Sequence, residues 1–146
     1  MKKAISILML TVLFFTAAGY ASEVALIPEK FEYRIRKNFP NAVVTSQKKV
    51  KDITIVSFTE NNKNYYAYFN SDNEMLMMAR LITPENMPIK AFTTVRDKFG
   101  ISQIRETLEV YAENGGAGYY VEAEFKNRII VAKVYSDGGL QIIKER

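Results

Sequence analysis

Two stretches decide the fold of this chain: "YYAYFNSDNEMLMMA" (Tyr65–Ala79) and "IIVAKVYSDGGLQII" (Ile129–Ile143). Each has an alternating run rich in apolar residues, then Ser-Asp within a short polar or glycine turn, then a second apolar run. Alternation with a period of two predicts strands with one buried face, and a short turn between two such strands predicts an antiparallel hairpin. The same hairpin pattern therefore occurs twice.

Two segments of helical periodicity precede these hairpins and lie 60 residues apart. They are "IPEKFEYRIRKNFP" (27–40) and "MPIKAFTTVRDKFG" (87–100), with a proline near each start and Gly100 after the second. Proline at a first helical position and glycine after the last are typical helix boundaries. The same spacing joins the apolar residues on one face of each helix, which are Phe31, Ile35 and Phe39 in the first and Ala91, Val95 and Phe99 in the second. This constant spacing indicates an internal repeat.

Four alternating segments follow each helix. The first set is "NAVVTSQKKV", "DITIVSFTE", "KNYYAYFN" and "EMLMMARLI"; the second is "QIRETLEVYAEN", "AGYYVEAEFK", "RIIVAKVYS" and "GLQIIKE". Short turns between successive strands require antiparallel neighbours, because a parallel return needs a crossover of about a dozen residues or more. We therefore predict an α+β fold: a tandem repeat of one helix plus four antiparallel strands, about 27–82 and 87–146, in one continuous sheet with both helices on one face.

The first residues have the pattern of a signal peptide. "MKK" is followed by the apolar run Ala4–Phe15 and by small residues at Gly19 and Ala21, which predicts cleavage after Ala21. The apolar run is shorter than the roughly 20 residues of a membrane-spanning helix. We expect a signal peptide at 1–21 and a single periplasmic or secreted domain at 22–146, with no stable membrane anchor after cleavage. Removing 21 of 146 residues, including two lysines, leaves 18 basic and 16 acidic residues.

The composition limits the chemistry. The sequence has neither histidine nor cysteine, which removes most nucleophile–base pairs and most metal-ligand sets. The one short basic run, "KKVK" at 48–51, is too small for a nucleic-acid surface. Glu122 and Glu124 alternate on one strand face, which we interpret as solvated, and "NSDNE" at 70–74 lacks the glycine and final acid of a calcium loop. We predict no enzyme, no cofactor, no metal and no nucleic acid partner.

Alternation also separates the two faces of the predicted sheet. If Val56, Phe58, Ala67 and Phe69 cover the helices, Tyr66 and Tyr68 lie on the opposite face. Tyrosine is favoured at interfaces, so this face is predicted to bind an exported protein or peptide. The predicted residues are Tyr66, Tyr68, Ile53, Ile55, Tyr120, Val131 and Lys133. Two other interpretations stay open: the faces are reversed, or these side chains cover one another on a large sheet.

A second function remains open as well. Met75, Met77 and Met78 in "EMLMMA" are flexible apolar side chains that suit an adaptable pocket for a small amphiphilic ligand. The alternative is ordinary packing of a strand. An enzyme that uses only carboxylates is a third hypothesis.

The Pro-started helix ending in "NFP", with "VSFTENNKNYYAYFNSDNEML" and "YYVEAEFKNRIIVAKVYSDGGLQI", resembles the PepSY-like, β-lactamase-inhibitor-like secreted proteins of Bacteroidetes. The resemblance covers nearly the whole chain after residue 21. It implies tandem helix-plus-four-strand repeats, helices on the convex side of the sheet, and a concave side that can hold a partner protein. This sequence departs from many such proteins in having no tryptophan.

Overall fold

The computed structural model of the chain describes residues 28–112 and 117–146. The predicted signal peptide at 1–21 lies outside these residues. In chain order, the elements are α2 (Glu29–Asn38), β1 (Val43–Val50), β2 (Ile53–Glu60), β3 (Lys63–Phe69), β4 (Met75–Ile82), the 3₁₀ turn η1 (Pro84–Asn86), α3 (Ile89–Phe99), the 3₁₀ turn η2 (Ile101–Gln103), β5 (Ile104–Ala112), β6 (Ala117–Phe125), β7 (Arg128–Val134) and β8 (Leu140–Glu145). No helix among the described residues is long and apolar enough to cross a membrane.

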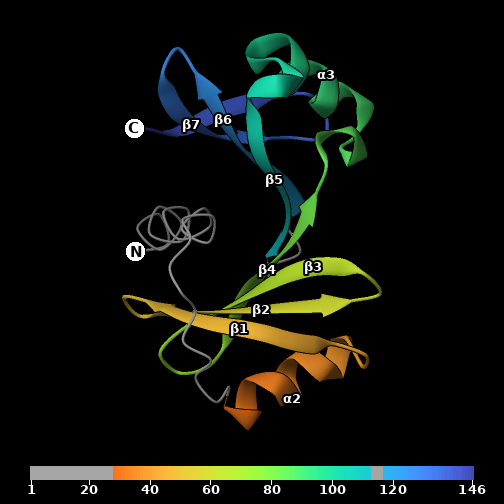
Figure 1. Cartoon of the computed structure of the whole chain (residues 1–146), viewed down its shortest axis with the longest axis vertical. Helices are drawn as coiled ribbons and strands as arrows, with labels where there is room; N and C mark the ends of the chain where they lie inside the picture. Colours follow the sequence, from red (N-terminus) through yellow and green to blue (C-terminus); the bar gives the residue numbers. More distant parts are fainter. Residues whose placement is uncertain (1–27, 113–116) are drawn as a thin grey trace.

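The eight strands form one antiparallel sheet in which each strand pairs with the next along the chain. Two-residue turns with positive φ connect β2 to β3 at Asn61 and Asn62 (51° and 60°) and β6 to β7 at Lys126 and Asn127 (51° and 61°). Such turns match the right-handed twist of the strands they join. Figure 1 shows the sheet curving between α2 and α3, which lie toward opposite ends of the long axis. The α+β class and the single antiparallel sheet are as predicted.

Both helices begin and end where the sequence predicts, to within about two residues. Pro28 and Pro88 precede the first helical residues, and Gly100 follows α3 with a φ of 79°. A left-handed φ of this kind strains a side chain with a Cβ, so glycine suits this position.

Each helix packs on its own cluster of buried side chains. Under α2 the cluster is rich in aromatic residues and consists of Phe31, Ile35, Ala42, Val56, Phe58, Ala67 and Phe69. Under α3 the side chains are smaller, and the cluster consists of Met87, Ala91, Val95, Phe99, Val121, Ala123, Ile130, Ala132 and Val134. The packing between helix and sheet therefore differs between the two ends, being rich in aromatic side chains under α2 and in smaller side chains under α3.

The two clusters lie on the same face of the sheet. Residues that pair across neighbouring antiparallel strands share a face. One line of such partners joins the cluster under α2 to the cluster under α3 through Tyr65, Arg80, Glu109, Tyr119 and Val134. We call this the helix-bearing face. The opposite, helix-free face carries the buried cluster Ile53, Ile55, Tyr68, Met77, Ala79, Leu108, Val110 and Val131.

Candidate functional site

All the residues that the sequence predicts as partner-binding lie on the helix-free face. Ile53, Ile55, Tyr68 and Val131 belong to its buried cluster, and Tyr66 and Tyr120 pack against that cluster, as Ile143 does. Lys133 pairs with Tyr120 across β6 and β7 and so shares its face. The structure thus brings these side chains to one side of the sheet, as the alternation indicates.

The burial of this face differs from the expectation. In the full chain, Tyr68 has an exposed fraction of 0% and Ile55 of 1%, whereas Tyr66, Tyr120 and Lys133 are half-buried. Tyr68, which the sequence predicts as partner-binding, is therefore a core residue. The cluster joins residues of β2, β3, β4, β5 and β7, so side chains on this face cover one another. Replacing Tyr68 by serine would remove a buried aromatic ring and destabilise the fold.

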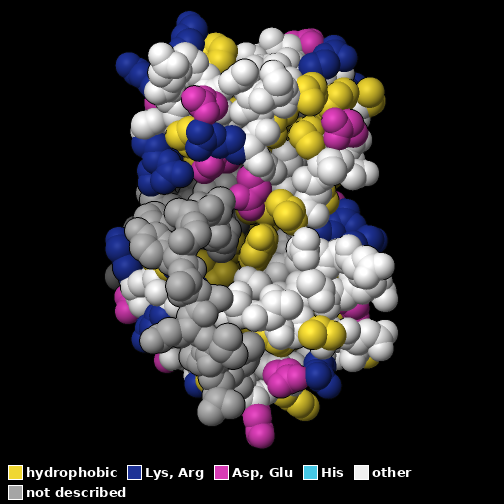
Figure 2. All heavy atoms as spheres, in the orientation of Figure 1, with side chains coloured by type: hydrophobic (Ala, Val, Ile, Leu, Met, Phe, Trp, Pro, Cys, Tyr) yellow, Lys and Arg dark blue, Asp and Glu magenta, His cyan; other side chains and the backbone are white. Residues whose placement is uncertain are grey.

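The partly exposed positions form the accessible part of the face. Leu81 is 36% exposed and pairs with buried Leu108. The ammonium of Lys133 lies 5.9 Å from the ring centre of Tyr120 and 5.0 Å from that of Tyr135. On the side of the molecule in Figure 2, hydrophobic side chains gather in the hollow between the two halves, with an acidic side chain beside them.

Two carboxylates lie side by side on the helix-free face. Glu106 on β5 pairs directly with Glu122 on β6, and like charges in such positions repel each other. Glu122 is only 4% exposed, which corrects the interpretation that it is solvated. Arg146 donates a hydrogen bond to Glu122 at 3.2 Å. Its backbone pairs with Ile129 and so places this guanidinium at the face.

Glu106 has no ion-pair partner in the described part of the chain. Burial, and then the negative charge of Glu122, raise the pKa of the Glu106 carboxyl to about 7. One of its oxygens, Oε1, is buried and has no hydrogen-bond partner among the described residues. Glu106 is therefore a carboxyl group that is half-buried, near its titration midpoint at neutral pH and incompletely satisfied.

The hydroxyl of Tyr68 is the second unsatisfied polar group of this face. It is buried and has no hydrogen-bond partner within the residues described. Burial, then the charge of Glu106, then Tyr66 raise the pKa of the Tyr68 hydroxyl far above its usual value.

Glu106 and Arg146 are not among the residues that the sequence predicts as partner-binding. The signal for Glu106 was present, because Glu106, Leu108 and Val110 alternate in step on β5 and the latter two are buried. No comparable signal exists for Arg146, since its position depends on how the end of the chain pairs with β7.

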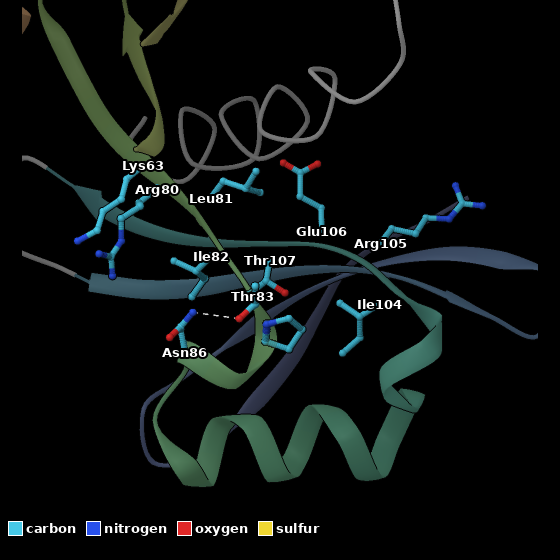
Figure 3. A pocket seen from close by; sticks show the side chains of 11 residues that line it. Lys63, Arg80, Leu81, Ile82, Thr83, Asn86, Ile104, Arg105, Glu106 and Thr107 are labelled. Carbon is cyan, nitrogen blue, oxygen red and sulfur yellow. Dashed lines mark hydrogen bonds between the residues drawn. The ribbon is translucent and has the colours of Figure 1, made fainter. Parts of the chain in front are cut away.

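A hollow beside Glu106 lies where β4 ends. It has a volume of about 600 Å³ and is lined by residues of β4, η1 and β5, with Lys63 at its edge. Figure 3 shows Leu81 and Glu106 on one side of these strands, and Ile82 and Ile104 on the side of α3. Thr83 accepts a hydrogen bond from Asn86 at 3.0 Å beside it. Glu106 is therefore approachable at the notch that β4 leaves next to β5.

No group of three or more acidic side chains in the described residues is placed to hold a metal ion. Asn70 and Glu74, from the stretch that faintly echoes a calcium loop, bond to each other across a hairpin turn at 2.9 Å. The turn interpretation of this stretch is therefore confirmed.

No protein-family model matches the sequence, and no curated protein matches it at a significant level. Solved structures do match. They include a BLIP-like protein from Bacteroides fragilis (15% identity, TM-score 0.66, covering 84% of this chain and 88% of that one). A DUF2874 family protein from Bacteroides uniformis has 14% identity and a TM-score of 0.68, with 82% of this chain and 88% of that one covered. A protein from Bacteroides eggerthii, provisionally described as periplasmic, has 13% identity and a TM-score of 0.69, with coverage of 84% and 89%.

These similarities show the fold. The chain has the α+β architecture of the BLIP-like and DUF2874 structures, which confirms the resemblance that the hairpin and helix motifs indicate. At such low identity, the function of this chain is a separate question, and the arrangement of its own residues has to answer it.

Proposed function

We propose that the protein is an exported, non-catalytic module that binds a protein or peptide partner on its helix-free face, in an inhibitory or regulatory role. The observation that carries the proposal is the contrast in coverage. The helices cover one face, whereas the other combines apolar and tyrosine side chains with two polar groups, the Tyr68 hydroxyl and Oε1 of Glu106, that have no hydrogen-bond partner among the described residues. Unpaired buried polar groups cost free energy, and a partner can satisfy them.

Export is supported by the signal-peptide pattern of residues 1–21. It is also supported by the similar structure from Bacteroides eggerthii that is provisionally described as periplasmic. Binding rather than catalysis is supported by the absence of histidine and cysteine. The resemblance given above implies a partner protein on the concave side of the sheet.

A repeated unit explains how such a face arises. Each helix is followed by four strands along the chain, and the two helices begin 60 residues apart. We infer that two copies of this unit, about 27–82 and 87–146, joined through β4 and β5. In each copy, the helix packs on one face of its four strands. The uncovered faces of the two copies then join into one continuous helix-free face.

Photo-crosslinking from two matched positions tests the proposal. Leu81 is 36% exposed on the helix-free face, and Ile142 is 47% exposed and pairs with Ala132 of the helix-bearing face. p-Benzoylphenylalanine at Leu81 should crosslink a partner in the exported fraction, and the same group at Ile142 should not. A partner that crosslinks only from Ile142 would contradict the proposed face.

A second candidate function rests on one specific observation. Met75, Met77 and Met78 all line a cavity of about 580 Å³ beside α2, together with Tyr33 and Lys37. This arrangement supports a carrier or sensor of a small amphiphilic ligand. Tyr33 on α2 and Ile89 on α3 are both 75% exposed, but only Tyr33 lines the cavity. A dansyl-labelled undecanoic acid should bind more weakly after Tyr33→Asp and unchanged after Ile89→Asp; equal effects would exclude this cavity.

A further inference from the structure

We propose that the hollow of about 600 Å³ at the end of β4 binds a small organic acid with one carboxylate group. The carboxylate is held on the helix-bearing face by Lys63, Arg80 and Thr107, and the apolar part of the acid lies along Ile82 and Ile104. All five residues line the hollow. This small-molecule site goes beyond the partner-binding function, because it uses the face that carries the helices.

The strand register brings the three polar side chains together. Arg80 on β4 pairs with Tyr65 on β3 and with Glu109 on β5. Lys63 and Thr107 lie two residues from these partners, so each is a diagonal neighbour of Arg80 on the helix-bearing face. Diagonal neighbours in an antiparallel sheet lie about 7–8 Å apart, which is within the reach of long side chains. One ligand group can therefore contact all three.

Unsatisfied polar atoms concentrate at this hollow. Four buried side-chain atoms lack a hydrogen-bond partner among the described residues, and three of them belong to residues that line it: Nε of Arg80, the Thr107 hydroxyl and Oε1 of Glu106. Thr107 is only 1% exposed. On the helix-bearing face, the Arg80 N–H can only donate, and the hydroxyl can donate as well. A carboxylate offers two oxygens and can accept one hydrogen bond from each.

Two of the three basic residues that line the hollow have counter-charges. The Arg80 guanidinium forms an ion pair with Glu109, and this pair does not use its Nε. Arg105 forms an ion pair with Glu124 at 2.6 Å. These two arginines are therefore balanced in charge, although Arg80 still has an N–H group to offer a ligand.

Lys63 supplies the unbalanced charge. It is exposed at the start of β3 and forms no ion pair within residues 28–112 and 117–146. Its cross-strand partner, Glu60, accepts a hydrogen bond from the backbone N–H of Asn41 at 3.2 Å. Glu106 also lines the hollow, but its carboxyl lies on the other side of the strands (Figure 3). One unbalanced cation fits a ligand with a single negative charge.

The rest of the lining fits a short apolar tail. Ile82, Pro84 and Ile104 line the hollow, and Figure 3 shows both isoleucines on the side of α3. Pockets for small molecules typically combine apolar walls with a few polar groups that orient the ligand. The ligand is therefore an acid with a small aliphatic or aromatic tail.

The test uses hexanoate, its neutral counterpart hexanamide, and inorganic phosphate. The protein is purified after export, with its isoleucine methyl groups labelled for NMR. We expect hexanoate to shift the Ile82 and Ile104 resonances with saturation. Hexanamide should bind roughly tenfold more weakly, because charge-assisted hydrogen bonds are stronger than neutral ones. Phosphate, which has no apolar tail, should leave both resonances unchanged.

Paired variants test the lysine. Lys63→Gln should weaken hexanoate binding roughly tenfold, because it removes the unbalanced cation. Lys126→Gln is the matched control, since Lys126 is also exposed at a hairpin, between β6 and β7, but does not line the hollow. Its affinity for hexanoate should stay within about twofold of the original, because distant surface charges are screened by salt.

A second pair of variants tests the hydroxyl. Thr107→Val keeps the shape of the side chain and should weaken hexanoate binding about fivefold by removing a hydrogen bond. Thr107→Ser keeps the hydroxyl and should retain most of the affinity. Thr107→Val also removes a buried hydroxyl that has no partner among the described residues, so it should be at least as stable as the original protein. Thermal unfolding checks that a loss of binding is not a loss of folding.

Several results would overturn the carboxylate site. Equal affinity for hexanamide would mean apolar contact only, and saturable shifts with phosphate would mean a general anion site. No saturable shift with hexanoate would mean that water satisfies Arg80 and Thr107. Equal losses in Lys63→Gln and Lys126→Gln would mean attraction by overall charge, and unchanged affinity in Thr107→Val would remove the hydroxyl from the site.

Discussion

The two faces of the sheet both carry buried apolar clusters, but the charges of their cross-strand polar pairs are balanced to different degrees. On the helix-bearing face, Arg80 and Glu109 pair with each other across β4 and β5. On the helix-free face, Glu106 and Glu122 are also cross-strand partners, yet they carry the same charge, and only Glu122 has a guanidinium. The pairing geometry is the same and the electrostatic outcome is opposite.

Unsatisfied atoms occur on both faces, so their presence alone does not distinguish them. The Thr107 hydroxyl and the Nε of Arg80 on the helix-bearing face also lack hydrogen-bond partners among the described residues. Thr107, however, is neutral, and the charge of Arg80 is balanced by Glu109. Glu106 is different because neither its charge nor its Oε1 atom has a partner within the described part of the chain. Among the described residues, the cross-strand pair of the helix-bearing face is thus balanced in charge, whereas that of the helix-free face is balanced only in part.

The largest effect on stability is expected from a substitution in the buried cluster under α2. Phe58 is 1% exposed, and its ring stacks on that of Tyr65 with ring centres 5.2 Å apart. Phe58→Ala leaves a large cavity and should lower the free energy of unfolding by about 4 kcal/mol. Urea denaturation measures the change. A loss below about 1 kcal/mol would mean that this cluster collapses around the cavity or contributes little to the fold.

A smaller effect should appear as a dependence of stability on pH. The folded-state pKa of Glu106 is about 7, raised from an ordinary value of 4.5. Between these two values the unfolded chain loses its proton while the folded chain keeps it, so stability falls as pH rises and levels off above the folded pKa. The total loss from this carboxyl should be about 2 kcal/mol after allowance for solvent screening.

The variant Glu106→Gln isolates this contribution from those of the other carboxylates. The difference in unfolding free energy between the variant and the original chain should increase from pH 5 to pH 8 in favour of the variant. A constant difference across that range would mean that burial and Glu122 do not raise the pKa of Glu106 in the folded protein.

Tyr68→Phe is expected to stabilise the protein. The substitution keeps the buried ring and removes a hydroxyl that has no hydrogen-bond partner among residues 28–112 and 117–146, so the folded state no longer bears the cost of its desolvation. The free energy of unfolding should rise by about 1 kcal/mol. Thermal unfolding of the two proteins tests this, and a clear decrease in the variant would show that the hydroxyl is bonded in solution.

Glu124→Gln should have the smallest effect on stability. Glu124 pairs with Arg105 at 2.6 Å, and both side chains are about half exposed. Exposed ion pairs contribute little, so the free energy of unfolding should change by less than about 0.5 kcal/mol at any pH. A change as large as that of Glu106→Gln would remove the distinction between the buried pair and its surface neighbour.

Local patterns in the sequence were sufficient for much of the fold. Pro28, Pro88 and Gly100 determine the helix boundaries through backbone geometry, and paired residues such as Asn61 and Asn62 adopt the φ values of tight hairpins. The period of two gave the side of the sheet on which each strand residue lies. These features depend on neighbours in sequence, which is why they could be predicted.

The chemistry of the helix-free face could not be predicted in the same way. Alternation places Tyr68 and Glu122 on this face, but it does not say whether the face is exposed. Their burial depends on the curvature of the whole sheet and on contacts between distant strands, and the neutralisation of Glu122 depends on Arg146. Such contacts are properties of the assembled structure, and this is why solvation was the wrong interpretation of Glu122.

The central claim is that the helix-free face binds the partner. The most direct test compares the affinity of two matched variants of this protein for that partner. Leu81→Arg and Ile142→Arg introduce the same bulky side chain at exposed apolar strand positions on opposite faces. Binding of the crosslinked partner, measured by calorimetry, should weaken at least a hundredfold for Leu81→Arg and less than about threefold for Ile142→Arg, since losses concentrate at buried interface positions. The reverse order, or equal losses, would contradict the account.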